Sequence, residues 1–328
     1  MARIALIMTA AALAIGVAGC GGSDDAPPPP SGPFAEALAT VGGGGANGSL
    51  GIGWADSAPA RALGGPRLVA DALGPNADTI VEEAPALERR FGLNPLAAER
   101  LVSVGGSYAF GLRLDGLDNR ELHDALVDAG GRIRPGPIAE LVDVGPYASV
   151  PEPLLALDIN GLGARDAFGE PGIVLAISDT ARASLLGQGG RLIDEPTYAT
   201  AADCLGDVVA VRMVPAKLLL STELGANAIA VGVGGGHEVL CVLGVDADRV
   251  DEIESSLRVA LAPDARDPRS GARVGDSVAS ADVTGGAERG IRYVRAELQP
   301  VAGEQPNFLF GAVSRGSLAE VLSSGAGP

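Results

Sequence analysis

The sequence predicts an α+β protein built from two related modules, each an antiparallel β-sheet with helices packed on one face. Short apolar or alternating runs, bounded by Gly, Pro, Asn or Asp, recur along the chain and are typical of β-strands. Glycine-containing turns separate two pairs of these runs, which favours antiparallel hairpins. Apolar residues spaced three and four positions apart indicate helices that follow the hairpins.

The predicted strands share this apolar pattern and cover residues 49–54, 101–104, 108–114, 172–178, 207–214, 228–233, 238–245, 291–298 and 307–313. The glycine turns lie at residues 105–107 and 234–237. Two predicted helices each carry one apolar stripe, formed by Leu122, Ala125, Leu126 and Ala129 in the first and by Val250, Ile253, Leu257 and Leu261 in the second.

An internal repeat supports the two-module organisation. Residues 112–115 lead into one predicted helix, and residues 243–246, found 131 positions later, lead into the other. The helices match at three places, with Glu121, Leu122 and Leu126 in the first and Glu252, Ile253 and Leu257 in the second. The identities are few, so chance similarity between two hairpin–helix units is the alternative explanation.

Composition limits the classes of function. A chain of 328 residues fits two domains, here predicted at residues 34–200 and 201–328. With 41 acidic against 24 basic side chains, the net charge is −17. Nucleic acid is therefore excluded as a partner, because the chain offers no cationic surface to displace the counterions of phosphate.

The first twenty residues have the features of a bacterial export signal. Arg3 precedes an apolar run at residues 4–17, which as a helix is about 21 Å long and too short for a hydrocarbon core of about 30 Å. Residues 17–20 read Val-Ala-Gly-Cys and resemble the lipobox of bacterial lipoproteins. The alternative is a buried N-terminal helix, although the run lacks the polar face of an amphipathic helix.

The lipobox resemblance covers only residues 1–20. It implies that residues 1–19 are a lipoprotein signal peptide, and that Cys20 becomes the N-terminus with a diacylglycerol group on its sulfur. Residues 20–33 then form a Gly/Pro-rich tether. We expect the protein on the extracytoplasmic face of the cell membrane, held by the lipid at Cys20, because anionic headgroups repel an acidic protein.

Acylation of Cys20 would leave Cys204 and Cys241 as a pair. Disulfides persist in the oxidising setting of exported proteins, so these two cysteines are a possible disulfide. The alternative is two buried free thiols, since Cys241 lies in an apolar run where free cysteine packs well.

The sequence predicts no catalytic residue, no metal site and no cofactor. His123 lies on the charged face of a predicted helix and His237 lies in a glycine turn, without a zinc-like spacing. Residues 43–48 match the G-x-G-x-x-G pattern of dinucleotide-binding proteins. A helix-like segment precedes these glycines and a strand follows, the reverse of the required order, so we predict a loop.

Residues 275–278, Gly-Asp-Ser-Val, resemble the serine block of the lipolytic SGNH hydrolases. In that family a catalytic histidine follows the serine, whereas here both histidines precede Ser277, and Val278 replaces the usual Leu. A serine without a base is a weak nucleophile. The order of the residues therefore disfavours an envelope hydrolase.

These observations predict a lipid-anchored envelope lipoprotein that is not an enzyme and serves as a binding or scaffold module. The alternative is a carrier that holds a lipid or another hydrophobic ligand in an apolar cavity, because aliphatic residues dominate the chain. The identity of the envelope protein partner or ligand stays open.

Overall fold

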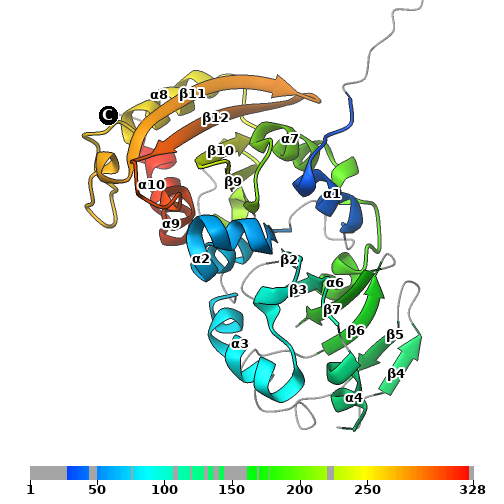
Figure 1. The fold of residues 1–328 in the computed structure, drawn as a ribbon. Helices are drawn as coiled ribbons and strands as arrows, with labels where there is room; N and C mark the ends of the chain where they lie inside the picture. Colours follow the sequence, from blue (N-terminus) through cyan, green and yellow to red (C-terminus); the bar gives the residue numbers. More distant parts are fainter. Residues whose placement is uncertain are drawn as a thin grey trace, which may run out of the picture.

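The structure of the protein is a computed structural model that describes residues 28–43, 50–74, 77–105, 110–118, 120–128, 132–135, 140–143, 161–167, 170–176, 178–219 and 225–324 (Figure 1). The predicted signal peptide and the predicted lipidation site Cys20 lie outside the described residues. Helices combine with an antiparallel sheet, so the protein is α+β, as predicted.

The described strands form one ten-stranded sheet and a separate two-stranded sheet. The large sheet contains β1 (Ile52–Asp56), β2 (Arg100–Val104), β3 (Gly111–Asp115), β6 (Gly161–Ala167), β7 (Glu170–Ala176), β8 (Ala210–Pro215), β9 (Ala228–Gly234), β10 (His237–Leu243), β11 (Val278–Glu288) and β12 (Ile291–Pro300). The small sheet pairs β4 (Arg132–Pro135) with β5 (Glu140–Asp143). All of these pairings are antiparallel.

The described α-helices are α1 (Pro33–Thr40), α2 (Ser57–Leu73), α3 (Ala77–Phe91), α4 (Arg120–Asp128), α6 (Asp179–Leu185), α7 (Pro196–Leu205), α8 (Val250–Ala260), α9 (Phe308–Arg315) and α10 (Ser317–Ser324). The two helices predicted from apolar spacing are confirmed as α4 and α8. The predicted turn at residues 234–237 is also confirmed, since Gly235 and Gly236 have φ of 57° and 85° between β9 and β10. These positive φ values are the ones that a two-residue hairpin turn requires.

One strand prediction is wrong. In the predicted strand 307–313, Asn307 is the N-cap of α9 and residues 308–313 form the start of this helix, with Leu309, Phe310, Ala312 and Val313 buried at helical spacing. A short continuous apolar run fits a buried strand and a buried helix equally well, so periodicity could not distinguish them. The prediction also omitted β4, β5, β6 and β11. In β11, exposed residues interrupt the apolar alternation.

Helices cover both faces of the sheet, so the expectation of helices on one face is wrong. One face packs with residues of α2, α8 and α9, such as Leu68, Leu257 and Phe310. The other face packs with residues of α1, α6 and α7. The strands explain this arrangement, because β9 is buried at every position, and a strand covered on both faces is apolar throughout.

The strand order is symmetric about the centre of the sheet. It runs β11-β12-β10-β9-β8-β1-β2-β3-β7-β6, and the central pair β1–β8 places Ile52 opposite Met213. Outward from this pair, one half reads β1, β2, β3, β7, β6 and the other reads β8, β9, β10, β12, β11. The strands of both halves therefore follow the chain in the same order, but the first half also contains α2 and α3 between β1 and β2 and the hairpin β4–β5 between β3 and β6.

Two details of the predicted repeat differ in the structure. The predicted boundary between residues 200 and 201 falls inside α7, so a division there would cut a helix. Residues 243–246 also extend beyond β10, whereas residues 112–115 lie within β3. The strands correspond better at the glycines that follow them, Gly116 and Gly244, which have φ of 81° and 67° and are 128 residues apart.

Candidate functional site

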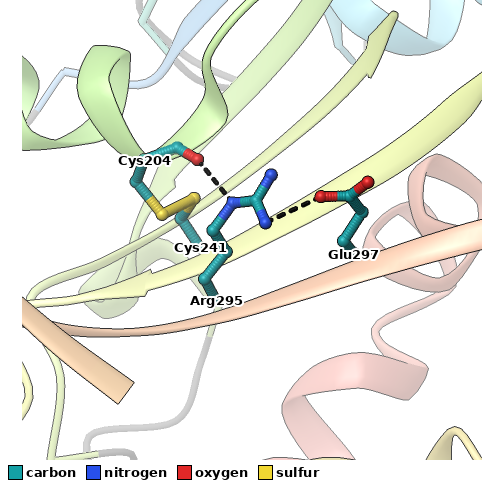
Figure 2. Close-up of a disulfide and its surroundings, with 4 residues drawn as sticks. All are labelled: Cys204, Cys241, Arg295 and Glu297. Carbon is teal, nitrogen blue, oxygen red and sulfur yellow. Dashed lines mark hydrogen bonds and ion pairs between the residues drawn. A yellow bond between two sulfur atoms is a disulfide. The ribbon is translucent and has the colours of Figure 1, made fainter. Parts of the chain in front are cut away.

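The two cysteines left over by the predicted lipidation form a disulfide in the structure. Cys204 belongs to the last turn of α7 and Cys241 to the middle of β10, with an S–S distance of 2.06 Å and a Cα–Cα distance of 6.3 Å (Figure 2). Both residues are buried, at 5% and 0% exposure. The bond therefore fastens the end of α7 to the sheet inside the core.

Local sequence explains why α7 lies so close to the sheet. Pro196 occupies the first turn, where its missing N–H costs nothing, and Gly206 ends the helix with φ of 68°. Buried alanines such as Ala201 and Ala202 allow close approach to the strands.

Tyr198 donates its hydroxyl to the Leu50 carbonyl oxygen over 2.9 Å. Burial raises the pKa of Tyr198, so the phenol remains neutral and keeps this hydrogen bond.

An arginine from β12 binds the end of α7 beside the disulfide. Arg295 donates from Nε to the Cys204 carbonyl oxygen over 2.9 Å, and its Nη1 lies 2.8 Å from Glu297 Oε2 (Figure 2). The last carbonyls of a helix have no partner within the helix and carry partial negative charge. A cation at this point therefore stabilises α7 while joining it to β12.

The turn between β11 and β12 binds the same helix. Thr200 donates to the Glu288 carbonyl oxygen over 3.2 Å, and Arg289 pairs with Asp203 at 3.0 Å. A second donor of Arg289 binds the carbonyl oxygen of Pro28, at the start of the described chain. We call the group formed by Thr200, Asp203, Cys204, Arg289 and Arg295 the α7 corner.

Arg289 holds an unfavourable backbone conformation. Its φ is 51°. Every other described residue with a positive φ is a glycine. Residues other than Gly, Asn and Asp rarely adopt this region, because the Cβ atom of an L-residue approaches the following carbonyl oxygen. The preceding and following strands leave only Arg289 and Gly290 for the turn, which demands positive φ at both positions.

A buried carboxylate lies on the opposite face of the sheet. Glu238 in β10 is 2% exposed and accepts hydrogen bonds from the backbone N–H groups of Phe308, over 2.9 Å, and Leu309, over 2.7 Å. Burial raises the pKa of Glu238 to about 7, and the two hydrogen bonds offset only part of this effect. The side chain thus caps the N-terminus of α9, which has no side-chain cap of its own.

A buried cation lies on the α7 side of the sheet. Arg113 in β3 is 2% exposed and pairs with Asp115 at 3.0 Å. It also donates to the Leu185 carbonyl oxygen over 3.1 Å and to Thr40 Oγ1 over 2.7 Å. Burial lowers the pKa of Arg113, while the Asp115 carboxylate opposes this effect. Arg113 therefore connects the ends of α1 and α6 to the sheet.

The candidates for catalysis lie on separate elements. His123 is in α4, 3.2 Å from Asp124 Oδ1, and His237 begins β10. Ser277 precedes β11, and its backbone bonds to Val274 and Val301. Among the described residues, no hydrogen bond joins the Ser277 hydroxyl to either histidine.

The glycine loop adds no site to these candidates. Gly43 donates to the Gly190 carbonyl oxygen over 2.7 Å in the connection between α1 and β1, and residues 44–49 lie outside the described residues. Within the described ranges, no group of three or more His, Cys, Asp or Glu side chains could hold a metal ion. In the same part of the chain, no helix combines the length and apolar character needed to cross a bilayer.

Sequence reasoning did not find most residues of the α7 corner. Asp203, Arg289 and Arg295 look like ordinary surface charges in the sequence, and their partners lie far along the chain. One local signal was present, since Gly290 directly precedes the alternating run of β12, and a glycine beside such a run is typical of a turn. Comparison with protein-family models, with curated proteins and with solved structures finds no match for the chain.

Proposed function

We propose that the protein is a lipid-anchored lipoprotein on the extracytoplasmic face of the cell membrane, where it serves without catalysis as a binding or scaffold module. The disulfide between Cys204 and Cys241 carries the proposal, because such bonds persist outside the reducing cytosol. It also leaves Cys20, in its lipobox-like setting, as the one cysteine of the chain available for lipidation.

The experiment is expression of the full chain in a bacterium that processes lipoproteins, with labelling by an alkyne fatty acid. We expect the label on the protein, partition into the detergent phase, and an intact mass that begins at Cys20 plus the lipid. Cys20→Ser should abolish labelling and partition. The double variant Cys204→Ser/Cys241→Ser is the matched control and should keep both. Membrane partition that survives Cys20→Ser would overturn the proposal.

We further propose that the two halves of the sheet are modules derived by duplication. The shared connectivity of the halves supports this, as does the start of α1 and α7 at a proline, Pro33 and Pro196. The module boundary then lies before Pro196. An experimental structure tests the proposal, since β2 and β3 should superpose on β9 and β10 with an offset of 128 residues. A different offset for each strand would contradict it.

The same purified protein can distinguish a carrier of a hydrophobic ligand from a scaffold protein. Organic extraction of the purified protein, followed by mass spectrometry, would release a stoichiometric apolar ligand from a carrier. A scaffold protein would release only detergent molecules or membrane lipids, in variable amounts. The first result would replace the proposed scaffold function with ligand transport.

A further inference from the structure

We propose that the α7 corner lies on the side of the protein that faces the membrane, and that Arg289 holds the tether against the protein so that this orientation is maintained. The proposal rests on the proposed lipidation of Cys20 for the position of the membrane. The contact between the tether and the protein does not depend on lipidation.

The first argument is the contact itself. Arg289 lies 261 residues from Pro28 in the sequence, and its guanidinium group binds the Pro28 carbonyl oxygen while it pairs with Asp203 of α7. The Arg289 side chain is 16% exposed, so these partners remove most of it from solvent. The tether is thereby joined to the turn between β11 and β12 and, through Asp203, to α7.

The second argument is the identity of the residue at the turn. A positive φ is unfavourable at a non-glycine residue such as Arg289, and Asn or Gly would avoid most of that cost. Arginine brings instead a fork of donors long enough to reach two acceptors at once. The strained backbone therefore places a tether-binding side chain where a conventional turn residue would bind nothing.

The third argument is length. Cys20 and Pro28 are eight residues apart, which corresponds to at most about 28 Å for a fully extended chain. A folded protein of about 300 residues has a radius of gyration of about 19 Å, and therefore a diameter of about 50 Å. The tether is shorter than the folded part is wide, so the surface next to Pro28 must lie closest to the lipid.

The arrangement of the elements decides which surface this is. α1 and the start of the described chain lie beside α7 and the turn between β11 and β12, whereas α8 and α10 lie toward the opposite end of that hairpin (Figure 1). A lipid surface would therefore face the α7 corner. α8 and the C-terminal helices α9 and α10 would be presented to partners farther from the membrane.

The first experiment tests the docked tether by electron–electron distance measurement in the mature full chain. Two nitroxide labels are attached through unnatural amino acids at Ala26 and at the exposed Asp251 of α8, which leaves the cysteines intact. We expect a narrow distance distribution in the parent protein. Arg289→Gly, which also relieves the positive φ and so preserves the fold, should broaden the distribution at least twofold.

Arg292→Ser is the matched control, because it removes the same charge three residues away on β12. It should leave the distribution narrow. A broad distribution in the parent protein, or equal widths in the parent and Arg289→Gly, would overturn the docked tether. Arg289→Asn provides a second variant with a turn residue that tolerates positive φ, and it should broaden the distribution in the same way.

The second experiment tests the orientation with energy transfer in vesicles that carry acceptor-labelled lipid headgroups. A donor dye at Asp207, directly after α7, should transfer at least twice as efficiently as a donor at Asp251, and Arg289→Gly should reduce this difference. Equal transfer from both positions would overturn the orientation even if the tether is docked. Failure of the protein to bind vesicles would instead overturn the proposed lipid anchor, and the nitroxide distances would still report on the tether.

Discussion

Arg113 donates to the hydroxyl oxygen of Thr40 over 2.7 Å, and this contact holds the end of α1 against β3. In the other half of the sheet, Cys241 in β10 holds the end of α7 through its disulfide with Cys204. β3 and β10 are both the third strand of their half, counted outward from the centre. Each half thus fastens a helix to the same strand position, one by charge and hydrogen bonds and the other by a covalent bond.

The disulfide between Cys204 and Cys241 should contribute measurably to the free energy of unfolding. The double variant Cys204→Ser/Cys241→Ser should lower the free energy of unfolding by up to about 4 kcal/mol, because the bond closes a loop of 37 residues. Urea titration followed by circular dichroism measures this change. Intact mass after alkylation without reductant checks the bond itself, and uptake of two alkyl groups at these cysteines would contradict it.

The ion pair and hydrogen bonds of Arg113 should contribute a comparable amount to the free energy of unfolding. Arg113→Leu should cost about 3–5 kcal/mol of unfolding free energy, because it leaves the buried Asp115 carboxylate without its cation. Adding Asp115→Asn to this variant should recover part of the loss, which identifies the uncompensated charge as its cause. Urea midpoints of the three proteins give the result. No recovery in the double variant would show that packing of the Arg113 side chain, and not its charge, is what matters.

Stability should fall between mildly acidic and neutral pH because of Glu238. Its pKa of about 7 in the folded protein lies above the value of 4.5 for an ordinary glutamate, so the folded state binds a proton more tightly than the unfolded chain. Folding is therefore favoured below about pH 4.5, and this contribution is lost as the pH rises to 7. The shift corresponds to about 3 kcal/mol at most.

The measurement is the urea midpoint of the parent protein and of Glu238→Gln at pH 5, 6, 7 and 7.5. Glutamine has no proton to lose, so the difference between the two proteins should change across this range. The variant should gain on the parent protein as the pH rises. Parallel curves would show that Glu238 titrates as an ordinary exposed glutamate.

The proposed function predicts no turnover at Ser277. Purified protein should hydrolyse p-nitrophenyl butyrate no faster than a buffer control, and Ser277→Ala should leave the rate unchanged, because no base is bonded to the hydroxyl within the described structure. The control is a heat-denatured sample at the same concentration. Turnover that disappears in Ser277→Ala would contradict the non-catalytic proposal.

The sequence by itself determined the local elements. β9 and β12 follow from their apolar and alternating runs, and α4 and α8 follow from apolar residues at i, i+3, i+4 and i+7. The glycines between β9 and β10 predicted the hairpin turn there, in which Gly235 and Gly236 have positive φ values. These features depend on neighbours within about ten residues, so the pattern of residues was sufficient to find them.

Only the tertiary structure decided the rest. Residues 308–313 are helical, and the N–H groups of Phe308 and Leu309, the first two residues of α9, bind Glu238, some 70 residues earlier in the chain. Helices on both faces of the sheet, and the contact of Arg289 with Pro28, likewise join segments far apart in sequence. Such partners leave no local pattern, because the energy of a contact depends on which groups the fold brings together and not on the spacing of residues along the chain.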